Sequence, residues 1–505
     1  MQNSHYITLH LNFIRKKSPN MNSSPNQWNL ENTYAELPEG FFSLQKPIAA
    51  ANPRLLLYNK QLANDLGLSH LDSDPNKTAA LLGGNEAPPD GRPLAQAYAG
   101  HQFGHFTMLG DGRAILLGEQ ITPIGDRIDI QLKGAGRTAY SRRGDGRATL
   151  YSMLREYVIS EAMHYMGIPT TRSLAVVTTG EEVFREEIHQ GAVLTRTSSS
   201  HIRVGTFQYA RNMRPIEDLK ALTQYTINRH YPELNDRERP ALELLKAVME
   251  KQIDLVVNWL RVGFIHGVMN TDNMSISGET IDYGPCAFMN AYNLKTVYSS
   301  IDNLGRYAFG NQANITRWNL TAFADSMLPL IADNEHEAIQ LAQEVIDSYQ
   351  EQFTLKYFQM HLKKLGIVYP EDSDKELVTR LFAAMEISKA DYTQTYLSLQ
   401  MDKELEGAVF KSHEFATWKD QWQAAKGRNG AFIESDLLMN QNNPRVIPRN
   451  HWVEKALETA VAGDLSYFTE LLSMLQQPYH DHPENLMFEK SPSDFDLKYQ
   501  TFCGT

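Results

Sequence analysis

Glycine is distributed unevenly along this chain, and its distribution limits the folds that the chain can adopt. Ten of the 31 glycines fall between Gly100 and Gly146, among strand-like segments such as RAILLGEQI (113–121). Short alternating segments separated by glycine indicate a small antiparallel sheet with tight turns. From Tyr151 the apolar spacing becomes helical and stops at Gly167, which predicts one helix directly after the sheet.

Beyond Gly205 the pattern is mainly helical. Apolar residues step by three or four over 242–260 and again over about 335–365. A sheet followed by one helix and then by a helical region is typical of the two lobes of a protein kinase. The predicted fold class is therefore α+β, a bilobal protein-kinase-like fold with a small sheet-rich N-lobe, a helical C-lobe and a helical C-terminal extension. The predicted boundaries are a tail at 1–26, the N-lobe at 27–205, the C-lobe at 206–330 and the helical region at 331–505.

Composition narrows the classes of partner. The 48 Lys and Arg residues against 60 Asp and Glu give a net charge of −12, which disfavours general binding to nucleic acid or to anionic membranes. No apolar run approaches the roughly 18 residues that span a bilayer. Two cysteines suit a reducing compartment, so a cytoplasmic protein is expected.

Residues 1–26 are interpreted as a disordered tail or an overlong translation start, with Met21 as an alternative start. A weak transit peptide is the less favoured interpretation.

Lys133 and Glu156 have the spacing of a functional pair. Lys133 ends the strand-like segment DIQLK, and Glu156 follows on the predicted helix. Protein kinases use a strand lysine paired with a helix glutamate to position the phosphates of ATP. A buried lysine needs such a partner because an unpaired charge in a packed interior is costly. The pair is predicted to position phosphate, and a purely structural ion pair is the alternative.

The tetrapeptide GDGR occurs twice, at 110–113 and 144–147, on either side of this lysine. Glycine lets backbone N–H groups approach an anion closely, and neighbouring arginines neutralise its charge. A plain hairpin turn and a solvated basic loop are the alternatives for these two segments. We predict that Asp145 and Gly146 reach a nucleotide and that nearby arginines face its phosphates.

Two arginines, Arg196 and Arg203, stand seven residues apart in VLTRTSSSHIRVGTF. If this segment is a strand and a turn, both guanidinium groups can face one cleft and bind phosphate oxygens through their planar forks. Arginines at this spacing are also common on plain surfaces. We predict phosphate binding because the neighbouring motifs favour it.

The segment HGVMNTDNMSISGETIDYGP, His266 to Pro285, has the spacing of a kinase catalytic loop. In the kinase pattern H-R-D-x-x-x-x-N, Asp accepts the hydroxyl proton and Asn holds a metal ion. Aligning His266 with the pattern puts Asn273 on the metal-binding Asn and Val268 on the base, and valine cannot accept a proton. Asp282, nine residues past Asn273, falls where the metal-binding Asp of D-F-G stands.

Asp272 is the best candidate for the missing base. It is the only carboxylate between His266 and Glu279. A carboxylate that reaches an acceptor hydroxyl can act as a general base. The alternative is that Asp272 only caps the turn TDN. His266 is predicted to be a packed, hydrogen-bonded core histidine and not a catalyst.

Five segments in this order carry a family resemblance: GDGRAILLGEQ, QLKGAGRTAYSRRGDGRA, LREYVISEAMHYMGIPTTR, HGVMNTDNMSISGETIDYGP and NNPRVIPRNHWVEKA. Together they resemble the selenoprotein O family of pseudokinase protein adenylyltransferases, from about Trp28 to the C-terminus. The resemblance implies a kinase-like fold that binds ATP in a flipped orientation. It also implies transfer of AMP, with Mg²⁺ or with Mn²⁺ in its place, to Ser, Thr or Tyr hydroxyls of other proteins, with release of pyrophosphate.

The resemblance also implies roles for individual residues. Asp272 is the proton acceptor, Asn273 and Asp282 are the metal ligands, and Glu156 is the partner of Lys133. The implied nucleotide contacts are Gly110, Gly112, Arg113, Lys133, Asp145, Gly146, Arg196, Arg203 and Asp282.

The cysteines depart from the family pattern. Some bacterial members pair a cysteine near the C-terminus with another just after the IDYGP segment. Cys503 fits the first place, whereas this chain carries Tyr298 at the second. Redox control through that bond is therefore not expected here, and Cys286 is the only other cysteine.

Two further functions fit the same residues. An atypical kinase could use Asp272 as its base, and a non-catalytic nucleotide-binding scaffold would need no base at all. The number of charged residues predicted at the site favours an enzyme. The sequence does not identify the protein substrates, the preferred acceptor or the oligomeric state.

Overall fold

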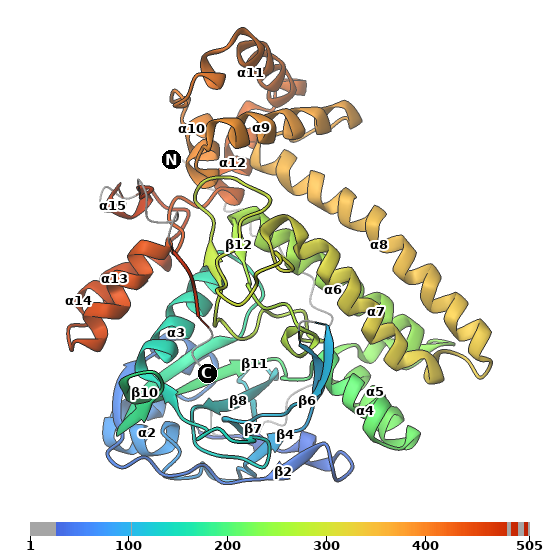
Figure 1. Cartoon of the computed structure of the whole chain (residues 1–505), viewed down its shortest axis with the longest axis vertical. Coiled ribbons are helices and arrows are strands. Elements are labelled where there is room, and N and C mark those ends of the chain that lie inside the picture. The colour runs from blue at the N-terminus through green and yellow to red at the C-terminus, as the bar shows by residue number, and fades with distance from the viewer. Residues whose placement is uncertain (1–26, 103, 482–485, 493–498, 503–505) are drawn as a thin grey trace, which may run out of the picture.

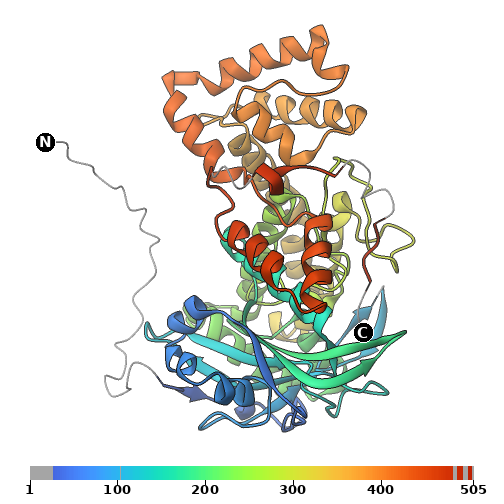
Figure 2. The same ribbon diagram turned by 90° about the vertical axis from the view of Figure 1, so that its left-hand side faces the viewer.

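The chain forms a sheet-rich N-terminal part and a helical C-terminal part, drawn at the bottom and the top of Figures 1 and 2. The computed structural model describes residues 27–102, 104–481, 486–492 and 499–502. The prediction for residues 1–26 and the position of Cys503 lie outside these residues. None of the helices described is both long enough and apolar enough to cross a membrane.

The main sheet has nine strands and is larger than the small sheet predicted. Its order is β2-β4-β7-β8-β11-β10-β3, with β1 on β7 and β9 on β11, and its pairs are antiparallel. The strands are β1 Leu30–Glu31, β2 Phe42–Leu44, β3 Arg54–Tyr58, β4 Leu94–Gln96, β7 Ala114–Ile121, β8 Arg127–Lys133, β9 Ala148–Thr149, β10 Arg172–Phe184 and β11 Ile188–Ser198. Two small pairs stand apart, β5 Ala99–Gln102 with β6 His105–Met108 and β12 Phe264–Ile265 with β13 Ala287–Phe288.

Alternation along the central strands separates an apolar face from a charged one. Ile130 and Leu132 of β8 are fully buried in one apolar cluster, together with residues of α1 Lys60–Asp65 and α2 Pro75–Leu82. Gln131 and Lys133 point to the opposite face because successive side chains of a strand alternate. In β11 Arg196 pairs with Gln131, so its side chain joins that second face.

Helix α3 Leu150–Tyr165 covers the charged face and is buried on nearly all sides. Thr149 caps its N-terminus by accepting the Ser152 N–H. Helices α13 Asn450–Val461 and α14 Ser466–Leu475 pack against α3 on one side (Figure 1). Arg155 fixes this arrangement, since its guanidinium contacts Glu454 at 2.9 Å and the Cys286 carbonyl at 2.6 Å.

The C-terminal part is helical, as predicted. Helix α6 Pro240–Val262 ends at Gly263, whose φ of +76° turns the chain into β12 and the loop that follows. The other helices are α4 Val204–Met213, α5 Ile216–His230, α7 Gln312–Ile331, α8 Glu335–Lys364, α9 Lys375–Ser388, α10 Tyr392–Gln400, α11 His413–Lys426, α12 Phe432–Asn442 and α15 Leu486–Glu489.

Candidate active site

A buried cluster of four charged residues joins the sheet, α3 and the segment after α6. Lys133 Nζ lies 2.5 Å from Glu156 Oε2 and also contacts the Asp282 carboxylate. Arg196 Nη1 lies 2.6 Å from Asp282 Oδ1 and 3.2 Å from Glu156 Oε1. The predicted pair of Lys133 and Glu156 therefore exists, and two cations face two carboxylates.

Asp282 adopts an uncommon backbone conformation within this cluster. Its φ is +64°, in the left-handed region that costs a non-glycine residue about 1–2 kcal/mol. Burial alone would raise the pKa of the Asp282 carboxyl, but Arg196, Lys133 and Arg203 outweigh burial and hold that pKa well below its usual value. The carboxylate is therefore ionised at neutral pH. A strained, charged residue of this kind is typical of a functional position.

The predicted catalytic loop forms a short 3₁₀ turn at Thr271–Asn273. Val268, at the position of the kinase base, is buried, and its carbonyl accepts the Asn273 side-chain N–H at 2.9 Å. His266 is 1% exposed and its Nε2 lies 3.0 Å from the Ile281 carbonyl. The prediction of a core histidine is confirmed, and burial lowers its pKa.

Asp272 carries a carboxylate suited to accepting a proton. Its Oδ1 is buried and has no hydrogen-bond partner among the residues described. Burial raises the pKa of Asp272 to about 6, and the positive charge of Arg203 partly offsets burial. A carboxylate with a pKa close to the working pH is more basic than an exposed one and is still ionised at neutral pH.

Asn273 and Asp282 fit a magnesium ion by the chemistry of their oxygen atoms. The Asn273 amide nitrogen is engaged with Val268, which leaves Oδ1 as an oxygen donor. Lys133 and Arg196 both use Asp282 Oδ1, so Oδ2 is not used by either cation. No group of three or more His, Cys, Asp or Glu side chains that could hold a metal lies within the described residues. Magnesium is commonly held by one or two protein ligands together with substrate phosphates, so two ligands suffice.

The chain between the two GDGR turns is hydrogen-bonded to both of them. Thr138 Oγ1 donates to the Asp111 carbonyl at 2.6 Å, and Ser141 Oγ donates to the Gly112 carbonyl. Gly146 accepts a bond from the Gly136 N–H at 3.0 Å. The chain between the two turns therefore ties them into one glycine-rich surface.

Gly110 is required by space as well as by its φ of +137°, since a Cβ atom there would overlap the Tyr140 ring. We expect Gly110→Ala to move this turn and to weaken ATP binding by about tenfold, roughly 1.4 kcal/mol. Isothermal titration with ATP measures the change. Gly125→Ala is the matched control because Gly125 also has a positive φ, of +89°, but has no atom within 4 Å of its Cβ position. Equal affinity of the two variants would contradict the prediction.

Arg203 and Asp145 lie in different surroundings. Arg203 is 2% exposed, so the alternative of a surface arginine is excluded for it, as it is for Arg196. Its Nη1 lies 3.3 Å from the Asp272 carbonyl, and its guanidinium stacks on Tyr98 at 4.2 Å from the ring centroid. Asp145 instead pairs with Arg185 at 2.8 Å, at the edge of the glycine-rich surface. The structure thus brings Arg203 to the catalytic loop and directs the Asp145 carboxylate away from the charged cluster.

Two buried residues of the site were not predicted. Gln131 accepts a bond from Arg196 Nε at 2.7 Å and donates to Asp111 Oδ2 at 3.1 Å. Asp111 is the acidic residue of the first GDGR turn; it lies 3.8 Å from Arg203, and burial raises its pKa. Gln131 could have been found from the sequence, because it stands two residues before Lys133 on the same face of the strand.

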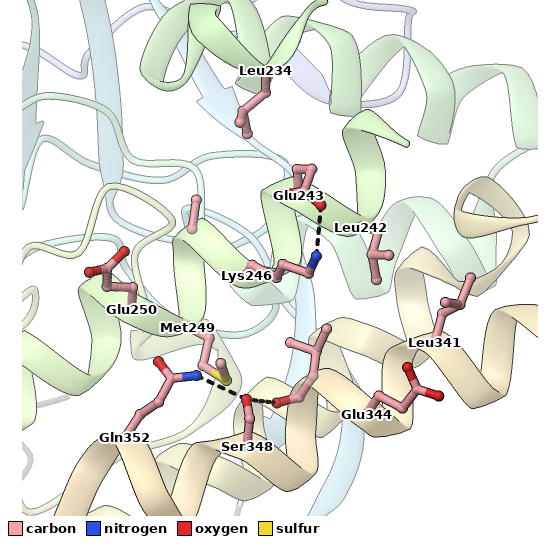
Figure 3. Close-up of a pocket in the computed structure, with 12 residues that line it drawn as sticks. Leu234, Leu242, Glu243, Lys246, Met249, Glu250, Leu341, Glu344, Ser348 and Gln352 are labelled. Carbon is pink, nitrogen blue, oxygen red and sulfur yellow. Dashed lines mark hydrogen bonds and ion pairs between the residues drawn. The ribbon is translucent and has the colours of Figure 1, made fainter. Parts of the chain in front are cut away.

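A separate groove of about 500 Å³ lies between α6 and α8 (Figure 3). Its lining combines apolar Leu242 and Met249 with carboxylates, and Figure 3 shows Lys246 directed at Glu243, 2.7 Å away. Glu250 and Glu344 complete an acidic rim. A triphosphate would be repelled there, so the candidate site is the charged cluster and not this groove.

The cysteine predictions are answered in part. Cys286 is a buried free thiol, and burial raises its pKa to about 11. Tyr298 packs on Tyr499 at 5.7 Å between ring centroids, and its carbonyl accepts the Thr501 N–H at 2.8 Å. The last described residues therefore lie beside the segment after Asp282.

Glycine-rich turns, a paired lysine and a nearby carboxylate with one unpaired oxygen are typical of an enzyme that acts on nucleotides. Residues 26–476 match the family model described as protein adenylyltransferase SelO, and the chain belongs to this family of nucleotidyltransferases. A protein nucleotidyltransferase YdiU from Halalkalibacterium halodurans is 53% identical over 481 residues, which cover 95% of this chain and 98% of the relative. Relatives with the same name from Brevibacillus brevis and Nitrosococcus oceani are each 52% identical and cover 95% of this chain and 98% and 97% of their own lengths.

Proposed function

We propose that this protein transfers AMP from ATP to Ser, Thr or Tyr hydroxyl groups of other proteins and releases pyrophosphate. The main support for the proposal is the contrast between Val268 and Asp272. Val268 is buried at the place of the kinase base, whereas Asp272 keeps an unpaired carboxylate oxygen beside Arg203. The names of the relatives, which are nucleotidyltransferases that act on proteins, support the same chemistry.

The proposed reaction uses residues of the charged cluster and of the loop at Thr271–Asn273. The acceptor oxygen attacks the α-phosphorus of ATP, its proton passes to the Asp272 carboxylate, and the bond from the α-phosphorus to the bridging oxygen breaks. Lys133 and Arg196, held by Glu156, neutralise phosphate charge, and Arg203 and the glycine-rich turns orient the nucleotide. A magnesium or manganese ion on Asn273 and Asp282 would neutralise further phosphate charge.

The proposal includes the arrangement of the chain. We place a kinase-like N-lobe at 27–205, a C-lobe with the catalytic loop at 206–330 and a helical extension at 331–505, with ATP bound in a flipped orientation. The charged face of the sheet opposite the loop at Thr271–Asn273 supports this division. We also place the protein in the cytoplasm.

Transfer of label from ATP tests the proposal. With magnesium and a total bacterial protein extract as acceptor, we expect label from α-labelled ATP, and none from γ-labelled ATP, to remain on protein after denaturation. Label from the γ position would identify an atypical kinase instead. Nucleotide binding without either label would identify a scaffold. Intact-mass spectrometry of the enzyme checks the result, because an AMP group and a phosphoryl group add different masses.

A further inference from the structure

We propose that the outer edge of strand β6 binds an extended segment of the acceptor protein by β-strand addition, next to the catalytic loop. This inference rests on the proposed function, since it supplies the docking surface for the protein substrate. Extended peptides bind exposed sheet edges through main-chain hydrogen bonds, and neighbouring side chains add specificity.

The register of the β5–β6 pair leaves the main-chain groups of Phe106 and Met108 directed outward. The Leu109 N–H donates to the Tyr98 carbonyl at 3.0 Å, and Gly100 pairs with Thr107. Hydrogen-bonded pairs alternate along an antiparallel ladder, so Thr107 faces β5 and its two neighbours face the opposite edge. Within the described part of the chain, β6 pairs only with β5.

This edge lies beside the proposed proton acceptor. The His101 N–H of β5 donates to Thr271 Oγ1 at 2.8 Å, and a Cβ atom at Gly100 would lie 3.0 Å from Asp272 Oδ1. A segment paired with β6 would lie two strand spacings, about 10 Å, from β5. About three further residues of extended chain span that distance, so the docked residues flank the acceptor hydroxyl.

Apolar and aromatic side chains continue the surface from β6 to α7. Phe106 and Met108 are 42% and 40% exposed, which is unusual for large apolar residues beside a site. The ring of His101 lies 5.4 Å from Phe106 and 5.2 Å from Trp318 of α7. We call Phe106, His101 and Trp318 the aromatic row. It offers contacts for an apolar or aromatic residue near the acceptor.

Arg306 and Tyr307 hold the aromatic row and the loop before Asp272 in place. Arg306 lies over Trp318 at 4.9 Å, and the Tyr307 hydroxyl donates to Asn270 at 2.6 Å, two residues before Asp272. Figure 1 draws β6 between the large sheet and helices α4 and α5. A segment docked on β6 would therefore lie beside the loop that carries Asp272.

Two variants test the edge separately from the chemistry. Phe106→Asp removes the apolar contact, and Met108→Pro removes an outward N–H without breaking a bond to β5. With α-labelled ATP and the bacterial protein extract as acceptor, we expect each variant to need about tenfold more acceptor for half-maximal labelling. ATP affinity and thermal unfolding are expected to stay unchanged. Ile124→Asp is the matched control, because Ile124 is 82% exposed at the distant turn between β7 and β8.

The outcomes separate the two proposals. If the wild-type protein transfers no α-label, the proposed function fails. If the wild type labels protein and both variants label it with unchanged acceptor dependence, the edge proposal is overturned. Sedimentation gives a second readout: a wild-type dimer that becomes monomeric in Met108→Pro would show that the edge binds another copy of this chain and not the acceptor.

Discussion

Asp272→Asn is expected to reduce AMP transfer by about 10²–10⁴-fold, the usual contribution of a general base, while ATP binding persists. The substitution keeps the size of the side chain and removes only its capacity to accept a proton. Arg203 binds the main-chain carbonyl of Asp272, so the substitution leaves that hydrogen bond in place. Single-turnover transfer with α-labelled ATP and equilibrium ATP binding, measured on the same preparation, separate the two effects.

The pH dependence gives an independent check of Asp272. Because burial raises its pKa to about 6, the ionised fraction that accepts protons grows as the pH rises. Transfer by the wild type should therefore increase between about pH 5 and 7, and the residual transfer by Asp272→Asn should lack this step. Asp254→Asn, an exposed aspartate that pairs with Lys356, should keep the wild-type profile. An unchanged rate in Asp272→Asn would remove Asp272 from the reaction.

Asp282→Asn is expected to reduce transfer by at least about 100-fold, because it removes an ionised carboxylate from the proposed metal site and a charge that orients two cations. The fold should persist, since Glu156 still faces both Lys133 and Arg196. Rates measured over a range of magnesium concentrations should show a weaker apparent affinity for the metal as well as a lower maximum.

Thermal unfolding and ATP binding serve as controls for Asp282→Asn. A melting temperature close to that of the wild type would assign the loss to chemistry and not to unfolding. Asp374→Asn is a suitable comparison, because Asp374 also pairs with an arginine, Arg428, at 2.8 Å but lies outside the charged cluster. Full activity in Asp282→Asn at low magnesium would contradict its role as a metal ligand.

The sequence predicted those strands and helices in which apolar residues recur at regular intervals. The segment 113–121 became β7, and the strand-like DIQLK became the end of β8. The helices expected over 242–260 and about 335–365 became α6 and α8 within a few residues. The sheet was underestimated because β3 pairs with β10, which lies far from it in the sequence, although β10 itself forms a hairpin with β11. Burial of α3 was also greater than its spacing indicates, because the C-terminal helices cover the side that would otherwise face solvent.

The site residues that belong to kinase-like motifs could be predicted from their residue type and spacing. Lys133 at the end of β8, Glu156 on α3 and Asp282 on the loop after α6 lie in one cluster. The kinase-like order of these three residues along the chain had predicted this. The pairing of Asp145 with Arg185 could not be foreseen, since it depends on how the distant hairpin of β10 and β11 folds back. The contacts of Asp111 depend in the same way on the burial of Arg203.

The bonds of Arg155 have a consequence for how the enzyme can be controlled. Its guanidinium binds Glu454 and the carbonyl groups of Gly284 and Cys286, one position along α3 from Glu156. Rotating α3 outward, so that Glu156 leaves Lys133, would break all of these interactions together. The contact of Glu156 with Lys133 is therefore braced by α13, so an outward rotation of α3 would also have to detach α13.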